Sequence, residues 1–185
     1  GEGRVPPRFP FVLGCRNMDY IAEIHNLSAK FYADYPHSKY PEILTKQGRP
    51  YSCLLVEYMA DIFICIPFRT NVHHKYAYHF KNSARSRRSH SGLDYTKAVL
   101  IKNADYLDLN ACAVVDQDEY KEAITNLSRI TKEVFSYIYD YRDDLLGLTP
   151  LHPSEWKRRY GMSTLPYFDS LLKECAAHIK TTPEP

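Results

Sequence analysis

A short apolar run at residues 62–66 restricts the fold more than any other feature of this sequence. The run from Ile62 to Ile66 is wholly apolar, has the length of a β-strand and ends at Pro67, which terminates strands. Residues 51–58 before it contain enough aromatic and β-branched types for a second strand, and residues 59–61 leave room only for a short turn. We therefore predict a buried antiparallel hairpin at the centre of a sheet.

Further strands and helices are expected around this hairpin. Apolar runs predict short strands at residues 98–101 and 111–115. Asp116 and Glu119 have capping-box spacing at the start of a long amphipathic pattern. Apolar periodicity predicts helices from Asn17 to Pro36, from Asp116 to Tyr141, from Pro153 to Gly161 and from Ser163 to Ile179. Local strands interspersed with these helices predict a single α+β domain.

The composition fits one globular domain. At 185 residues, with 44% hydrophobic and 25% charged residues, the chain is long enough to bury a core. No apolar run approaches the roughly 20 residues of a membrane span, so no membrane association is expected. The five cysteines form no C-x-x-C pair, which argues against disulfides or structural zinc and favours the reducing cytoplasm. Cys53, Cys65, Cys112 and Cys175 lie in apolar patterns and are expected to be buried rather than nucleophilic.

Positive charge is concentrated in one segment, although the whole chain has a formal net charge of only +2. Between Arg69 and Lys102 there are eight Lys or Arg residues and one acid, Asp94, so this segment carries +7 and the rest of the chain −5. Such asymmetry is expected of a protein that presents one face to a polyanion. We call residues 69–102 the basic segment.

The first part of the basic segment lies in a stretch without carboxylates. Residues 62–93 contain no Asp or Glu, but they contain four histidines and six Lys or Arg residues. Two-metal nucleases need carboxylates, and zinc hydrolases usually show His, Asp or Glu ligands at helical spacing, so neither a metal nor another cofactor is expected. The stretch does supply what RNA cleavage by its own 2′-hydroxyl requires, namely cations for the phosphate and groups that transfer protons.

The residues that follow the predicted hairpin are the first candidates for chemistry. Arg69, Thr70 and Asn71 come directly after a buried strand, which is a rigid place from which to present a guanidinium, a hydroxyl and an amide. Each nearby histidine is either an acid–base catalyst or a hydrogen-bonded structural residue. These histidines are His73, His74, His79 and His90.

Other parts of the basic segment also admit two interpretations. The arginines at 85, 87 and 88, interleaved with serines, form either a solvated loop or a contact with the phosphate backbone. Tyr76 and Tyr78 alternate as in a strand, so each packs in the core or stacks on an unpaired base. Arg49 and Lys97 each stand at the start of a predicted strand, where they are either surface charges or phosphate ligands.

Four short sequence motifs together resemble those of the type III toxin–antitoxin endoribonucleases, the superfamily of ToxN and AbiQ. The TenpN/CptN-like branch is the most similar. The resemblance spans roughly Met18 to Tyr141 and leaves the C-terminal helices uncovered. The motifs are Arg49-Pro50-Tyr51 with the strand after it, Ile64 to Asn71, His79 to Ser83, and Gly92 to Val99.

The resemblance implies a compact, strongly bent antiparallel β-sheet or barrel like that of MazF and Kid, elaborated by several helices. It implies a toxin that cuts single-stranded cellular or phage RNA to leave a 2′,3′-cyclic phosphate, in phage defence by abortive infection. It also implies a partner, a small structured antitoxin RNA made from a repeat transcript, in a higher-order RNA–protein assembly. Residues 1–16 would then be an N-terminal extension or a remnant of processing, 17–145 the toxin domain and 146–185 a C-terminal helical extension packed on the same domain.

The resemblance also assigns roles to particular residues. Arg49 matches the basic position before the first core strand, and Arg69 with Thr70 approximately matches a Thr/Ser-Lys cluster after the second. Asn71 stands where relatives have a second hydroxyl, and Arg49 cannot shuttle protons as a lysine would. The acid–base role therefore moves to a histidine or to Lys75.

The resulting hypothesis is a metal-independent endoribonuclease. Its expected catalytic residues are Arg49, Arg69, Thr70, Asn71, His73, His74, Lys75 and Lys97. Its expected RNA-binding residues are His79, Lys81, Asn82, Ser83, Arg85, Arg87, Arg88 and His90. One rival is a non-catalytic RNA-binding regulator that uses the same basic segment. Another is an enzyme acting on small phosphate esters, although the basic segment is longer than a small ligand needs.

Overall fold

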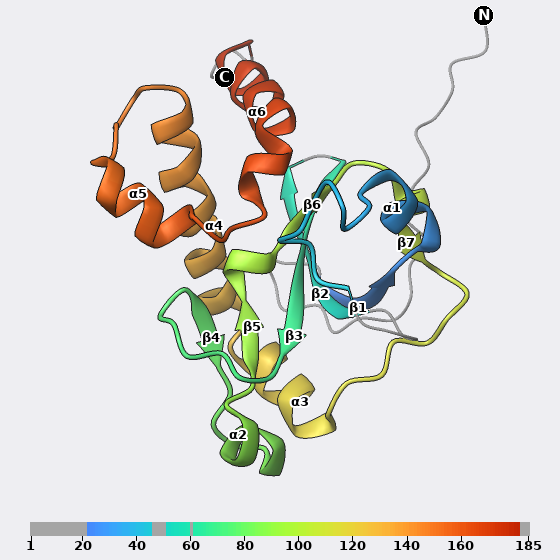
Figure 1. Ribbon diagram of the computed structural model, residues 1–185. Helices are drawn as coiled ribbons and strands as arrows, with labels where there is room; N and C mark the ends of the chain where they lie inside the picture. Colours follow the sequence, from blue (N-terminus) through green and yellow to red (C-terminus); the bar gives the residue numbers. More distant parts are fainter. Residues whose placement is uncertain (1–21, 46–50, 60, 182–185) are drawn as a thin grey trace, which may run out of the picture.

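The computed structural model describes residues 22–45, 51–59 and 61–181 (Figure 1). Within these residues, seven strands form one antiparallel sheet, surrounded by six α-helices. The strand order is β4-β5-β3-β2-β1-β7, with β6 also paired to β3. The predicted α+β class and antiparallel sheet are confirmed. The barrel is not supported, because the described strands do not close: β4 and β7 lie at opposite ends of the order and do not pair.

The predicted central hairpin is confirmed. Strand β2 spans Ser52–Met59 and pairs with β3, Ile62–Arg69, through a tight turn in which Asp61 has a positive φ of 65°. Strand β3 has β2 on one side and both β5 and β6 on the other. Neighbours on both sides explain why all its residues except Arg69 are buried, and why its sequence is continuously apolar.

Strands β5, Gly92–Asp94, and β6, Val99–Ile101, follow each other along β3 with an interruption between them. The interruption is a 3₁₀ turn, η1, at Tyr95–Lys97. It shifts the register by three residues: the numbers of the paired residues Phe68 and Leu93 add to 161, whereas those of Cys65 and Val99 add to 164. Asp94, the last residue of β5, pairs with Ala77 of β4 and is also the N-cap of this turn.

The helix predicted from Asn17 to Pro36 is largely wrong. Residues 17–21 lie outside the described residues, Ala22–Leu27 form strand β1, and only Ala29–Asp34 are helical, as α1. Pairing of β1 with β2 on one side and β7 on the other outweighs the local helical spacing of its apolar residues. The Ser28 hydroxyl then caps α1 by accepting the backbone N–H of Phe31 at 3.2 Å.

The strand predicted at residues 111–115 is also wrong. A 3₁₀ turn, η2 at Ala104–Tyr106, leads instead into the two-residue strand β7, Leu107–Asp108. The Asp108 carboxylate accepts the backbone N–H groups of Asn110 and Ala111, each at 3.1 Å, and this turn takes the chain out of the sheet. The apolar residues beyond it therefore have no partner strand within the described chain, and Val114 is 84% exposed.

The long helix predicted from Asp116 is confirmed in position but consists of two helices. These are α3, Gln117–Thr125, and α4, Leu127–Leu145, separated by Asn126. Asp116 caps α3 as expected, accepting the N–H groups of Asp118 and Glu119. Glu119, however, does not reach back to complete a capping box, because its carboxylate is fully buried against the basic segment.

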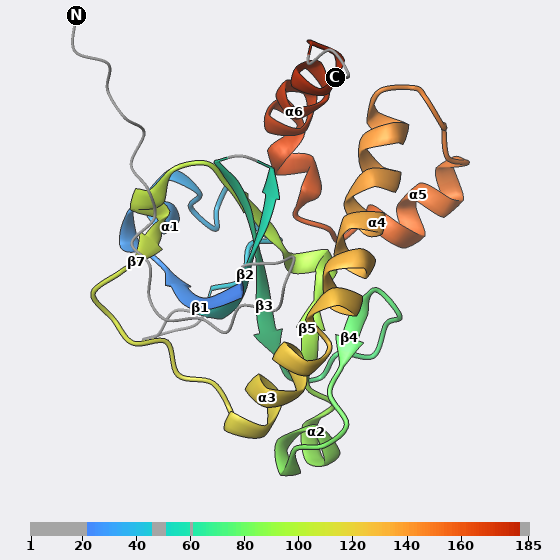
Figure 2. The same cartoon turned by 180° about the vertical axis from the view of Figure 1, so that it is seen from behind.

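Helix α5, Pro153–Tyr160, is confirmed, and the last helix is confirmed as a 3₁₀ turn, η3 at Leu165–Phe168, followed by α6, Asp169–Thr181. Helices α4, α5 and α6 lie on one side of the sheet, and α1 and β7 lie at the other (Figures 1 and 2). Helix α6 contacts α4, and η3 contacts β6. None of the helices in the described part of the chain has the length and apolar content of a membrane span.

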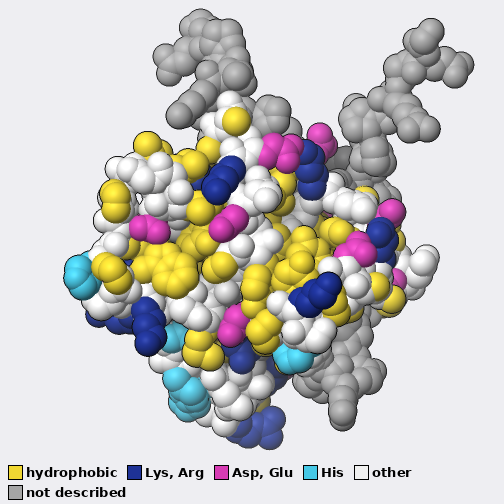
Figure 3. Space-filling model, turned by 45° about the horizontal axis from the view of Figure 1, so that its top comes forward, with side chains coloured by type: hydrophobic (Ala, Val, Ile, Leu, Met, Phe, Trp, Pro, Cys, Tyr) yellow, Lys and Arg dark blue, Asp and Glu magenta, His cyan; other side chains and the backbone are white. Residues whose placement is uncertain are grey.

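The core packs the sheet against helices α4 and α6 and also includes Phe31 of α1, which is fully buried. Ile64, Ile130 and Leu172, from three different elements, are all fully buried within it. Figure 3 shows hydrophobic side chains also spread across the middle of one outer face. The prediction that the cysteines are buried is confirmed at positions 53, 65 and 175, but it is wrong for Cys112, which is exposed on the segment after β7.

Candidate functional site

The end of β3 opens into a hollow of about 720 Å³, which we call the strand-end hollow. It contains the predicted Arg69-Thr70-Asn71 cluster, and the start of β2 and the segment before α3 form its other walls. Arg49, predicted to stand at the start of β2, lies outside the described residues. The lining residues are Tyr51, Ser52, Phe68, Arg69, Thr70, Asn71, Arg85, Val114, Val115 and Asp116.

Arg69 is fixed by a buried carboxylate. One oxygen of Asp94 accepts a hydrogen bond from the Arg69 guanidinium, and the other accepts the backbone N–H and the hydroxyl of Thr96, at 3.0 and 2.7 Å. His74 Nε2 lies 3.3 Å from that second oxygen. Asp94 is 0% exposed and Arg69 27% exposed, so the carboxylate anchors the guanidinium at the edge of the strand-end hollow.

The contacts of Asp94 also set its acidity. Burial alone would raise the pKa of this carboxyl, but hydrogen bonds from His74, Thr96 and Arg69 and the charge of His74 outweigh burial and lower the pKa below its ordinary value of 3.8. Asp94 is therefore ionised at every physiological pH.

Asp94→Asn is expected to reveal this contribution through the pH dependence of stability. A lowered folded-state pKa gives stability that is fully present above the unfolded pKa and lost as the pH falls through the folded value. The unfolding free energies of the unaltered chain and of Asp94→Asn should differ by a constant amount from about pH 7 to about pH 5, and the difference should shrink below about pH 4. Urea denaturation across this range measures it, and a pH-independent difference would contradict the expectation.

Asn71 and Val72, which follow Thr70, are held by the end of the next helix, α2, Ala84–Ser89. The backbone N–H of Asn71 donates to the carbonyl of Ser89 at 2.7 Å, and that of Val72 donates to the carbonyl of His90 at 3.0 Å. Asn71 adopts a left-handed conformation with a φ of 57°, which asparagine tolerates better than most residues. The end of β3 is therefore tied to the end of α2.

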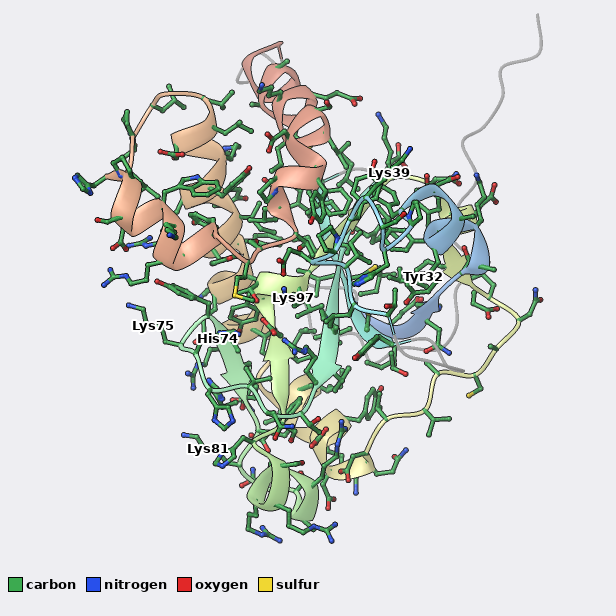
Figure 4. The ribbon with its side chains drawn as sticks, viewed as in Figure 1. Tyr32, Lys39, His74, Lys75, Lys81 and Lys97 are labelled. Atoms are coloured by element: carbon green, nitrogen blue, oxygen red, sulfur yellow. The ribbon has the colours of Figure 1, made fainter. Side chains whose placement is uncertain are left out.

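His73, His74 and Lys75 do not line the strand-end hollow. They line a second hollow of about 800 Å³, which we call the helix-side hollow, between the loop before β4 and the helix α4. The structure thus separates the predicted catalytic residues into two groups, with Asp94 contacting a member of each, Arg69 and His74. Figure 4 shows His74 and Lys75 on the loop that enters β4, on the side of the sheet where α4 and α5 lie.

Lys97, predicted to hold phosphate, lies in neither hollow. Its ammonium group forms an ion pair with Glu42 and donates to the backbone carbonyl of Met162 at 2.7 Å. Its side chain is 10% exposed. Lys97 therefore joins the η1 turn to the segment after α1 and to the segment after α5.

The predicted RNA-binding residues surround strand β4, Ala77–His79, and helix α2. Strand β4 pairs with β5, and a Cβ atom on Gly92 would lie 2.5 Å from the Tyr78 carbonyl, so only glycine fits there. The His79 ring donates to the carbonyl of His74 at 2.8 Å. Five of the predicted residues are exposed, namely Lys81, Asn82, Arg87, Arg88 and His90.

Two buried carboxylates of α3, which we did not predict as part of the site, organise this region. Glu119 accepts hydrogen bonds from the hydroxyls of Ser83 and Ser91, which flank α2, and from Arg85 within it. Glu122 accepts the Tyr78 hydroxyl at 3.2 Å and the backbone N–H groups of Lys81 and Asn82 at 3.0–3.2 Å.

These carboxylates left only a weak signal in the sequence. The capping-box spacing predicts a capping role for Glu119, and the helical periodicity of the apolar residues predicts no role for Glu122. Asp94 had a stronger signal, since it is the one acid in the basic segment and stands beside predicted strand residues.

Comparison with protein-family models, curated proteins and solved structures finds no match to this chain.

Proposed function

We propose that this chain is a metal-independent endoribonuclease of a type III toxin–antitoxin system, cutting single-stranded RNA at the strand-end hollow. The observation that supports it most is the pair of guanidinium groups that line this hollow, each held by a fully buried carboxylate. Arg69 is held by Asp94 and Arg85 by Glu119, the latter at 3.0 Å. Guanidinium groups fixed in advance are suited to stabilise the charge of an attacked phosphate.

The chemistry of the proposed reaction needs only the RNA and these side chains. The 2′-oxygen attacks the adjacent phosphorus, the bond to the 5′-oxygen breaks, and a 2′,3′-cyclic phosphate remains. One proton leaves the 2′-hydroxyl and one reaches the departing 5′-oxygen. Arg69 and Arg85 hold the phosphate, and Thr70 and Asn71 orient it. Proton transfer is assigned to His73 or His74, which line the neighbouring helix-side hollow; His74 lies 3.3 Å from Asp94, the carboxylate that also holds Arg69.

The residue types of the region support a reaction without metal. Within the described residues, no group of three or more His, Cys, Asp or Glu side chains is arranged to hold a metal ion. The nearby carboxylates Asp94, Glu119 and Glu122 are instead occupied by hydrogen bonds from the basic segment. In this proposal, nuclease activity is inhibited in the cytoplasm by a small structured antitoxin RNA. This RNA occupies the strand-end hollow and assembles with several copies of the chain.

A non-catalytic RNA-binding regulator is the second candidate. The same ion pairs favour it, because pairing with Asp94 and Glu119 would give Arg69 and Arg85 a structural role without any part in catalysis. The exposed cations Lys81, Arg87 and Arg88 would then suffice to bind the phosphate backbone.

RNA cleavage in excess EDTA is expected and separates the two candidates. The purified chain is incubated with a long single-stranded RNA and EDTA, and the new ends are analysed for a 2′,3′-cyclic phosphate. A control RNA carrying 2′-O-methyl groups throughout should bind but stay intact, because it has no attacking hydroxyl. Binding without cleavage of the unmodified RNA would leave the regulator, and cleavage that EDTA abolishes would overturn the metal-independent mechanism.

A further inference from the structure

The helix-side hollow has a floor of aromatic rings. Tyr76, Tyr95 and Tyr137 line it, and the rings of Tyr76 and Tyr137 lie 5.6 Å apart at a tilt of 44°. Tyr95 and Tyr137 are buried, whereas Tyr76 is half-buried. A half-buried ring supported from behind by other rings offers one flat apolar surface to a planar ligand.

The rim of this hollow is positively charged. Four cations, Lys75, Arg129, Lys132 and Arg159, face two carboxylates, Glu133 and Asp140, so the lining has an excess of two positive charges even with neutral histidines. The carboxylates are already engaged. Glu133 accepts from the Tyr95 hydroxyl at 2.7 Å and from Arg129 at 2.6 Å, and Asp140 pairs with Arg159 at 3.1 Å.

Two lysines of the rim remain available to a ligand. Neither Lys75 nor Lys132 has a carboxylate within ion-pair distance in the described part of the chain, although Lys75 is close enough to Glu155 for its charge to lower the pKa of that carboxyl. Both lysines are exposed. Lys75 comes from the loop before β4 and lies 5.4 Å above the Tyr76 ring, and Lys132 comes from α4.

We propose that the helix-side hollow binds one unpaired nucleotide of an RNA strand, with its base on Tyr76 and its phosphate between Lys75 and Lys132. An aromatic ring and two ammonium groups without a carboxylate partner match the two parts of a nucleotide, and the exposed Lys75 side chain, which lies over the Tyr76 ring, moves to the phosphate when the base stacks there. A purely apolar ligand would leave the ammonium groups without a partner, and inorganic phosphate would leave the ring uncovered.

The position of the hollow ties it to the proposed cleavage site, so this inference rests on the proposed function for its choice of RNA. Asn71 of the strand-end hollow and Lys75 of the helix-side hollow are four residues apart, and an extended chain of that length spans at most about 14 Å. One RNA strand can therefore occupy both hollows, with a nucleotide beside the cut held in the second.

The test measures binding of an uncleavable RNA to the full chain. A fluorescent single-stranded 2′-O-methyl oligonucleotide is titrated at several salt concentrations. Lys132→Ala is expected to weaken binding about fivefold at 0.1 M salt and to reduce the salt slope by about 0.7, the value of one single-strand phosphate contact. Tyr76→Leu is expected to weaken binding by about five- to 150-fold through lost stacking. Lys173→Ala, at an exposed lysine of α6 outside the hollow, is the matched control.

The outcomes separate this inference from the proposed function. If Lys132→Ala binds the oligonucleotide with the same binding constant and salt slope as Lys173→Ala, the proposed nucleotide site is overturned, even if the unaltered chain cuts RNA. If both variants lose oligonucleotide binding as expected but the unaltered chain cuts no RNA, the nucleotide site stands and only the proposed nuclease activity is overturned. If Tyr76→Leu does not fold, Lys132→Ala decides alone. Binding of adenosine monophosphate is measured for the same variants. If Lys132→Ala loses this binding but keeps oligonucleotide binding, the site is assigned to free nucleotides and the assignment to an RNA strand is overturned.

Discussion

Arg69→Ala is expected to slow RNA cleavage by about 10²–10³-fold, the usual effect of removing one fixed group that stabilises transition-state charge. The same change should also destabilise the fold. Asp94 is fully buried and would lose its guanidinium partner, although Thr96 and His74 would still contact it. Leaving such a carboxylate uncompensated costs about 3 kcal/mol of unfolding free energy. Single-turnover cleavage and urea denaturation measure the two effects.

Arg69→Lys separates the catalytic from the structural loss. A lysine keeps a positive charge beside Asp94, so most of the stability should return. It presents one compact charge instead of a planar fork, so cleavage should stay well below that of the unaltered chain. Arg87→Ala, at an exposed arginine of α2, is the control for general loss of charge and should weaken RNA binding without slowing the bound reaction. Full cleavage by a folded Arg69→Ala chain would remove Arg69 from the proposed mechanism.

Glu119→Ala is expected to release helix α2 and with it the exposed cations of the basic segment. Glu119 is fully buried and accepts hydrogen bonds from Ser83, Arg85 and Ser91, at both ends and in the middle of this region. A six-residue helix has no stability of its own, so these contacts hold it. Leaving buried hydroxyls without an acceptor costs about 3 kcal/mol in total, with the half-exposed Arg85 contributing little.

Limited digestion with trypsin reports the release of α2 directly, because the helix contains three arginines. Cleavage after Arg85, Arg87 and Arg88 should become much faster in Glu119→Ala than in the unaltered chain, while cleavage in α4 and α6 should change less. Glu155→Ala removes a partly exposed carboxylate that pairs with two arginines on α5, and it is the matched control. Equal protection of α2 in both variants would show that Glu119 does not hold it.

The elements that could be predicted are those in which local pattern and tertiary environment agree. The run from Ile62 to Ile66 is apolar because β3 has neighbours on both sides, so sequence and structure carry the same information. The helical stretches after Asp116 and Pro153 also agree, since their caps and apolar faces are local. Strand β1 could not be predicted, because its pairing with β2, some 30 residues away, decides its conformation.

The candidate site was predictable in composition but not in arrangement. The basic segment has eight cations, yet four of them are paired in the structure: Arg69 with Asp94, Arg85 with Glu119, Lys97 with Glu42 and Lys102 with Glu174. Three of these four carboxylates come from outside the segment, so counting charges along the chain could not reveal them. The sequence likewise could not show that Thr70 and His74, four residues apart, belong to different hollows.

The hydrogen bonds that join Asn71 and Val72 to Ser89 and His90 have a consequence for the proposed nuclease. They fix the end of α2, with its exposed arginines, to the residue that follows Thr70. Phosphates bound by Arg87 and Arg88 would thereby be held at a fixed distance from a phosphate bound by Arg69. In the proposed nuclease, the protein backbone would then set the distance between the anchored part of the RNA and the cut, whatever the sequence of the RNA.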